Sequence, residues 1–105
     1  MGAKYLVSFS KSAETDTAEI WTYIATDSPE NAARFVRRLD EHVVTLEHFP
    51  ERCPLIKENA IWGTSYRHLI EGDYRIIFRI AGKSVYIVRI VRGSRLIDRE
   101  SLPQD

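Results

Sequence analysis

The sequence predicts an α+β fold with the order β-α-α-β-β-β, in which an N-terminal helical hairpin packs on a mostly antiparallel twisted sheet. Apolar residues recur at helical spacing in the first half of the chain and alternate at strand spacing from residue 66 onward. Capping residues, prolines and glycines separate the segments. The 105 residues are expected to form one domain over residues 1–105, because this length is near the usual domain size.

The first half begins with a predicted strand over residues 4–9, which is rich in aromatic and β-branched residues. Ser10 is expected to cap a helix that runs to about residue 25. The buried face of this helix is predicted from the 3.6-residue spacing of Ala13, Thr17, Ile20, Trp21 and Ile24.

A second helix is predicted to begin at Ser28 and Pro29, a cap followed by a residue suited to the first helical position. It should end near residue 48, before Pro50. Its apolar seam consists of Ala32, Val36, Leu39, Val43 and Leu46. The two helices form an antiparallel hairpin, and Trp21 and Tyr23 are expected to pack across it as core residues.

Residues 50–63 read as a long, partly structured connection that Ile56, Ile61 and Trp62 attach to the core. Strands are predicted over residues 66–70, 74–80 and 85–91. A three-residue loop over 81–83 would pair Ile80 with Ser84 and place Arg75 and Arg89 on one face of the sheet. A two-residue loop would separate these two arginines, since a shift of one residue reverses every side chain. The three-residue loop is predicted, because it segregates charge from the core. The sheet face that the helical hairpin does not cover is then expected to be open, at least in part, and to carry arginines.

The net charge of zero conceals an uneven distribution. Residues 1–60 hold seven Lys/Arg and ten Asp/Glu, whereas residues 61–105 hold eight and five. The basic half could face nucleic acid or an acidic partner protein, or its arginines could simply be solvated. The single Cys53 cannot form an internal disulfide, and no membrane span or signal peptide is apparent, so a cytoplasmic protein is expected.

The usual catalytic motifs are missing from the sequence. There is no glycine-rich phosphate loop and no Cys/His spacing typical of a metal site, so neither a cofactor nor a metal is expected. His42 and His48 are interpreted as surface residues of a helix, and Cys53 as a loop residue without a nucleophilic role. Three acidic residues are interpreted as a solvated helix face: Glu14, Asp16 and Glu19.

Arginines of the second half are the remaining candidates for a functional site. Such a cluster repels itself in the free protein, and a phosphate backbone or a carboxylate-rich partner would relieve that repulsion by bidentate pairing. The candidate residues for binding such a partner are Arg67, Arg75, Arg79, Arg89, Arg92 and Arg95.

The chain resembles the RelE/ParE superfamily of bacterial toxins. The resemblance rests on the element order together with Gly-Asp-Tyr-Arg-Ile-Ile-Phe-Arg-Ile at 72–80 and Val-Tyr-Ile-Val-Arg-Ile-Val-Arg-Gly-Ser-Arg at 85–95. Residues 8–25 are similar to the ParE opening, in which a strand leads into a helix with an Ala-Glu-x-Asp-x-x-x-Ile-x-x-Tyr-Ile pattern, and Phe49-Pro50 also fits. The likeness covers nearly the whole chain.

The resemblance implies a type II toxin that a cognate antitoxin, ParD-like or similar, holds inactive. The RelE branch cleaves mRNA on the ribosome, and the ParE branch poisons DNA gyrase. Arg75 and Arg95 match functional arginines of the RelE branch, but Ser101 stands where RelE-type enzymes carry a tyrosine. The chain also has Arg92-Gly93-Ser94-Arg95 where many ParE members have His-Gly-x-Arg.

We therefore expect a ParE-like, non-enzymatic toxin that acts on gyrase, because no obvious general base is present. The alternative is a ribosome-dependent endoribonuclease in which Arg75 and Arg95 stabilise phosphate charge and His68 acts as the base. A second alternative is a non-toxic relic or protein-binding module of the same fold.

Overall fold

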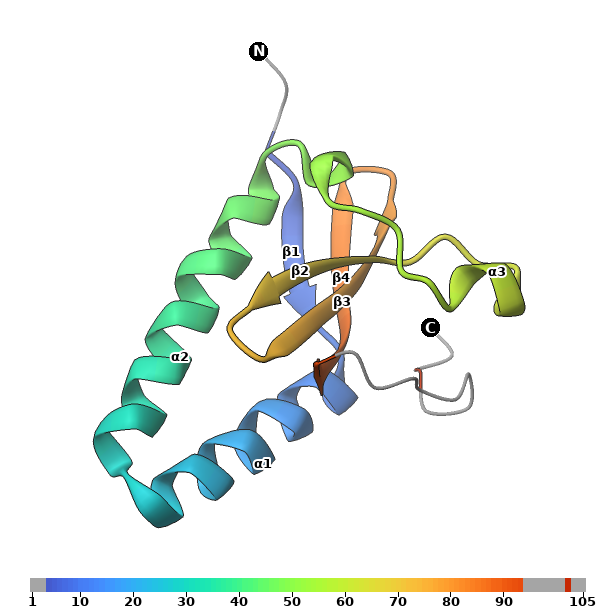
Figure 1. Ribbon diagram of the computed structural model, residues 1–105. Helices are drawn as coiled ribbons and strands as arrows, with labels where there is room; N and C mark the ends of the chain where they lie inside the picture. Colours follow the sequence, from blue (N-terminus) through green and yellow to red (C-terminus); the bar gives the residue numbers. More distant parts are fainter. Residues whose placement is uncertain (1–3, 94–101, 103–105) are drawn as a thin grey trace.

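The computed structural model of the protein describes residues 4–93 and Leu102, and it confirms the predicted element order. A helical hairpin lies on one side of a four-stranded sheet (Figure 1). The elements are β1 (Leu6–Phe9), α1 (Lys11–Asp27), α2 (Pro29–Val44), η1 (Thr45–Glu47), η2 (Pro50–Arg52), α3 (Asn59–Trp62), β2 (Arg67–Glu71), β3 (Tyr74–Ala81) and β4 (Ser84–Arg92). No helix within the described residues is long and apolar enough to cross a membrane.

Serine caps begin both long helices, as predicted. The Ser10 hydroxyl accepts the Ala13 N–H at 3.0 Å, and the Ser28 hydroxyl accepts the Asn31 N–H at 3.2 Å. These bonds satisfy amide groups that have no partner within the first helical turn. The α-helical part of α2 ends at Val44, and the chain continues as the 3₁₀ turn η1, so the regular helix is shorter than expected.

The sheet has the order β1-β4-β3-β2. The strands β2, β3 and β4 are antiparallel neighbours, and β1 pairs in parallel with β4. The parallel pair is possible because the two helices carry the chain across the sheet between β1 and the later strands. The strands β1 and β2 therefore form the two edges of the sheet.

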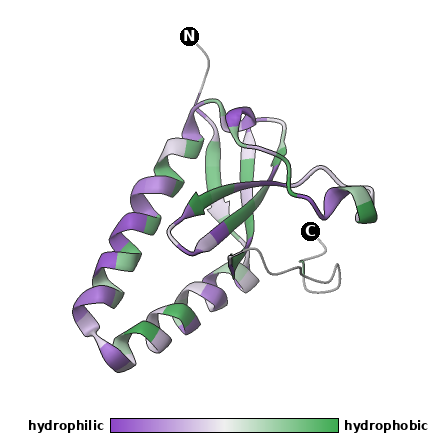
Figure 2. Cartoon of the chain, in the orientation of Figure 1, coloured by the Kyte–Doolittle hydropathy of each residue, from purple (hydrophilic) through white to green (hydrophobic). Residues whose placement is uncertain are grey.

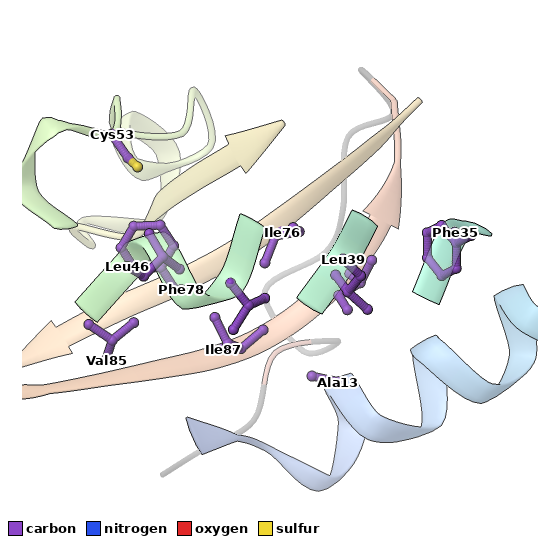
Figure 3. Packing of buried hydrophobic residues seen from close by; sticks show 11 residues of the cluster. Ala13, Phe35, Leu39, Leu46, Cys53, Ile76, Phe78, Val85 and Ile87 are labelled. Carbon is purple, nitrogen blue, oxygen red and sulfur yellow. The ribbon is translucent and has the colours of Figure 1, made fainter. Parts of the chain in front are cut away.

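The main hydrophobic core lies between the hairpin and one face of the sheet. Leu39 and Val43 of α2 are buried against Ile76 and Ile87, as predicted, and Ala13 of α1 closes one end (Figure 3). Hydrophobic segments recur along α2 between hydrophilic ones, and the strands are mostly hydrophobic (Figure 2). This pattern is typical of a helix with one stripe against a sheet.

The opposite face of the sheet carries a second apolar cluster, so it is not the open arginine face that the sequence suggested. Ile77 and Val88 from the sheet pack there with Ile56 and Leu102. Ile56 therefore attaches the 50–63 segment as predicted, but Ile61 does not, because its side chain is 78% exposed.

The register of the β3–β4 hairpin differs from the prediction. Ile80 pairs with Val85 instead of Ser84, and the turn has the two residues Gly82 and Lys83. A β-bulge then leaves Val88 without a partner, because Phe78 pairs with Ile87 and Ile77 with Arg89. The extra residue shifts the register by one. Beyond the bulge, even-numbered residues of β3 therefore pair with even-numbered residues of β4.

Trp21 and Tyr23 are not core residues. They are 43% and 69% exposed, respectively. Both lie in the second half of α1, which extends beyond the sheet toward the tip of the hairpin (Figure 1). Only two elements meet at this tip, so one side of each helix remains in solvent.

Candidate functional site

Arg75 forms a buried ion pair with Glu58. Its Nη1 and Nη2 donate to the two carboxylate oxygens of Glu58 at 3.0 and 2.8 Å. The residues are 3% and 1% exposed, and they join β3 to the segment that precedes α3. Bidentate pairing in this dry position compensates the guanidinium charge within the protein. The cation is therefore not presented to solvent as the sequence had suggested.

Arg89 is likewise paired inside the protein. Its Nε and Nη2 donate to the Asp16 carboxylate at 2.6 and 2.8 Å, and the Ile90 N–H donates to the same group at 2.9 Å. The hydrogen bond to Asp16 raises the pKa of Arg89 above its ordinary value. Asp16 is buried, so its assignment to a solvated helix face is wrong.

The predicted cluster of Arg75 and Arg89 on one open face consequently does not form, since each binds a carboxylate from a different segment. Sequence reasoning missed both of these carboxylates. Asp16 could have been found, because it lies on the same helical stripe as Ala13 and Ile20. Glu58 occupies an irregular segment that gives no such pattern.

The other candidate arginines have separate environments. Arg67 donates to the backbone carbonyls of Glu51 and Cys53 at 3.0 and 2.6 Å, which fastens the 50–63 segment to β2. Arg79 stacks over the Tyr86 ring, with 4.5 Å from Cζ to the ring centroid. Arg92 is exposed at the end of β4. The candidates Arg95 and Ser101 lie outside the described residues.

A cavity of about 600 Å³ opens beside β2 and β3. It brings together three of the sequence candidates, namely His68, Arg75 and Arg92. The remaining lining residues are Leu55, Lys57, Ile70, Gly72, Asp73, Tyr74 and Gly93. The cavity therefore combines an apolar wall with several basic groups.

His68 is the titratable group in this cavity with the clearest perturbation. Burial lowers its pKa below the ordinary value of 6.5, and the positive charge of Arg75 lowers it further, whereas Glu58 opposes the shift. The buried Nδ1 has no hydrogen-bond partner among the residues that the structure describes. His68 is thus neutral at pH 7 and can accept a proton, but no described residue within hydrogen-bond reach of Nδ1 fixes the orientation of its ring.

Two further side chains that could be reactive, those of Cys53 and His42, lie in structural environments. Cys53 is buried, and burial raises the pKa of its thiol, which disfavours the thiolate form. His42 is not a simple surface histidine, since its Nδ1 lies 2.7 Å from Oε1 of the buried Glu71. Among residues 4–93 and Leu102, no group of His, Cys, Asp or Glu has an arrangement that could hold a metal ion.

Comparison with known proteins supports the resemblance. The family described as "ParE toxin of type II toxin-antitoxin system, parDE" matches residues 7–97. Similar solved structures include the chromosomal ParDE toxin–antitoxin system of P. aeruginosa, with a TM-score of 0.69 and 24% identity, covering 87% of this chain and 98% of that one.

The RelBE2 toxin–antitoxin complex of Mycobacterium tuberculosis is also similar, with a TM-score of 0.58 and 23% identity, covering 85% of this chain and 98% of that one. No curated protein matches the sequence. Both structures share the fold, and the family match spans most of the chain. The chain therefore belongs to the ParE toxin family of type II toxin–antitoxin systems.

Proposed function

We propose that this ParE-type toxin inhibits DNA gyrase, blocks replication and is neutralised by a cognate antitoxin. The observation that carries the choice of target is the buried Arg75–Glu58 pair. In the RelE-type alternative, Arg75 would stabilise negative charge on the scissile phosphate. A carboxylate that already binds both of its terminal nitrogens works against that role, because it cancels the positive charge that the phosphate would need.

Neutralisation by an antitoxin is supported by family membership and by the two similar structures, which come from toxin–antitoxin systems. Of the candidate arginines within residues 4–93, Arg92 is the one that lies exposed beside a cavity. The pairs that hold Arg75 and Arg89 support the fold, so we propose that Arg92 contributes more to partner binding than either of them.

The ribosome-dependent endoribonuclease remains the second candidate, because one observation favours it. His68 and Arg75 line the same cavity, and the depressed pKa of His68 keeps its imidazole available as a base near neutral pH. In this candidate, His68 would take the proton of the attacking 2′-hydroxyl and Arg95 would face the phosphate.

The two targets are separated by inducing the toxin without antitoxin. We expect replication to stop and cells to become filamentous with a DNA-damage response, and purified toxin to inhibit supercoiling by gyrase. Primer extension on ribosome-bound mRNA should show no new ends. New ends within codons that disappear in Arg95→Ala and His68→Gln would establish the endoribonuclease instead. A protein that neither inhibits gyrase nor cleaves mRNA would be the non-toxic relic.

A further inference from the structure

The cavity beside β2 has an aliphatic wall that the described fold leaves uncovered. Leu55 and Ile70 are 54% and 51% exposed, although both are large apolar residues. Both line the cavity, and an isolated bridge between Leu55 and Arg67 holds the segment of Leu55 beside β2. Exposed aliphatic groups that line one hollow are typical of a binding surface.

Basic and acidic side chains both line this cavity. Lys57 and Arg92 line it together with Asp73, and the charge of Arg75, which also lines it, is compensated by Glu58. Arg92 is exposed, and no described residue forms an ion pair with it. Its guanidinium is therefore positioned to receive a carboxylate at the open end of the cavity.

The backbone of β2 is also open at this point. The His68 N–H donates outward, away from β3, to the Pro54 carbonyl at 3.1 Å. The direction of the backbone N–H and C=O groups repeats every two residues along a strand. The N–H and C=O of Ile70 therefore point to the same outer edge as those of His68. No described residue bonds to either group. Ile70 thus offers one donor and one acceptor at the edge of the sheet, next to the cavity.

These features favour a peptide over RNA as the occupant. An extended peptide can supply both the acceptor and the donor that Ile70 needs, and an aliphatic side chain can cover Leu55 and Ile70. An RNA chain has hydroxyl and base N–H donors, but it has no aliphatic side chain to cover Leu55 and Ile70 and no backbone donor and acceptor at the spacing of a β-strand. The basic charge of Arg92 is equally suited to a carboxylate.

We propose that this β2 groove, formed by Leu55, Ile70 and Arg92, binds an extended antitoxin segment in which an aliphatic residue lies close to an acidic one. The segment pairs with Ile70 at the sheet edge, its aliphatic side chain fills the cavity and its carboxylate binds Arg92. This inference rests on the proposed neutralisation by an antitoxin, and it assigns that interaction to one edge of the sheet.

The test uses full-length toxin and the full-length antitoxin encoded beside it. We expect Ile70→Asp and Arg92→Glu each to weaken the complex at least tenfold by calorimetry. Matched controls at the opposite edge of the sheet and on α2, Leu6→Asp and Arg37→Glu, should leave the affinity within twofold, since both parent residues are exposed. Hydrogen exchange should show the Ile70 amide protected in the complex and open in the free toxin.

Each contrary outcome has a distinct meaning. If wild-type toxin binds and is neutralised, but both groove variants bind equally well and the Ile70 amide stays open, the groove inference is overturned while the proposed function stands. If wild-type toxin does not bind the antitoxin, the proposed function itself fails. Protection of the Ile70 amide by an RNA oligonucleotide, or in free toxin that sediments as a dimer, would assign the groove to RNA or to a second copy.

Discussion

Glu58 and Arg75 show how much a single buried charge matters in this protein. Both side chains lie in a dry environment, and each provides a counter-charge for the other. Glu58→Gln would leave the guanidinium of Arg75 without its counter-charge. Breaking a buried pair on one side costs about 3–5 kcal/mol. We therefore expect a loss of that order in the free energy of unfolding, measured by urea denaturation.

The exposed Glu41 on α2 provides the matched control. Glu41→Gln makes the same chemical change in solvent and should alter the free energy of unfolding by less than about 0.5 kcal/mol, as most surface substitutions do. Equal stability of the Glu58 and Glu41 variants would mean that the ion pair contributes nothing to the fold. Arg75 would then become a candidate for binding again.

His68 should make the stability of the toxin depend on pH. Burial lowers its pKa in the folded protein, so between that value and 6.5 the unfolded chain binds more protons. The free energy of unfolding should therefore fall as pH falls through this window. In His68→Gln this part of the decline should be absent, which urea titrations at pH 7.5 and 5.5 can measure.

The exposed His48 provides the matched control. His48→Gln makes the same substitution at the surface and should keep the decline in stability that His68 produces. If His68→Gln also keeps it, the imidazole of His68 titrates in the folded state as it does in the unfolded chain. The imidazole of His68 would then be more hydrated in the cavity than its burial implies.

The residue types of the candidate site could be read from the sequence, but their partners could not. The arginines of the second half stand out by composition alone. Whether an arginine faces solvent or a carboxylate depends on contacts between residues far apart in the chain, such as Arg89 with Asp16 and Arg75 with Glu58. Periodicity places a residue on a face of its own element and does not show what covers that face.

At the scale of the element, α2 is the helix on which the core depends. Leu39 is 2% exposed and packs between the hairpin and the sheet. Leu39→Ala should lower the free energy of unfolding by about 2–5 kcal/mol, the usual range for a buried large-to-small change. Thermal and urea unfolding of the free toxin measure this loss.

Val44 lies near the end of the same helix and is mostly exposed, so Val44→Ala is the control. It should change the stability by less than about 0.5 kcal/mol. If Leu39→Ala melts like the parent protein and yet loses toxicity, Leu39 acts at a binding surface. The packing that assigns it to the core would then be incorrect.

The elements themselves were largely predictable, because caps and hydrophobic periodicity act locally. Ser10, Ser28 and Pro29 begin the helices where the sequence indicated. The hairpin register was not predictable in the same way, since it depends on two features together. The tight turn at Gly82 and the bulge at Val88 shift the pairing in steps of one residue, and alternation alone cannot locate the bulge.

At the scale of the whole molecule, the acidic and basic halves of the sequence meet inside the fold. Asp16 and Glu58 from the acidic half bind Arg89 and Arg75 from the basic half. The uneven distribution of charge thus serves long-range contacts that bring the hairpin and the 50–63 segment onto the sheet. Substitution of Arg75 and Arg89 by glutamate would therefore disturb the fold itself. A loss of binding in such a variant could not be assigned to the interface.

The folded toxin should be stabilised by its antitoxin through mass action. A partner that binds only the folded form adds about 2.7 kcal/mol at 100 times its Kd and about 4.1 kcal/mol at 1,000 times. These values are comparable to the expected cost of Leu39→Ala. We therefore expect this variant to aggregate when expressed alone and to remain soluble when co-expressed with the antitoxin.

The groove variant Arg92→Glu separates this effect from folding. Arg92 is exposed, so the free variant should melt like the parent toxin. Its weakened binding should, however, reduce the rise in melting temperature that the antitoxin produces, by an amount that grows with antitoxin concentration and levels off at a value set by the ratio of the two Kd values. When combined with Leu39→Ala, Arg92→Glu should abolish rescue at limiting antitoxin. Rescue that is unaffected by Arg92→Glu would place the stabilising contacts elsewhere on the toxin.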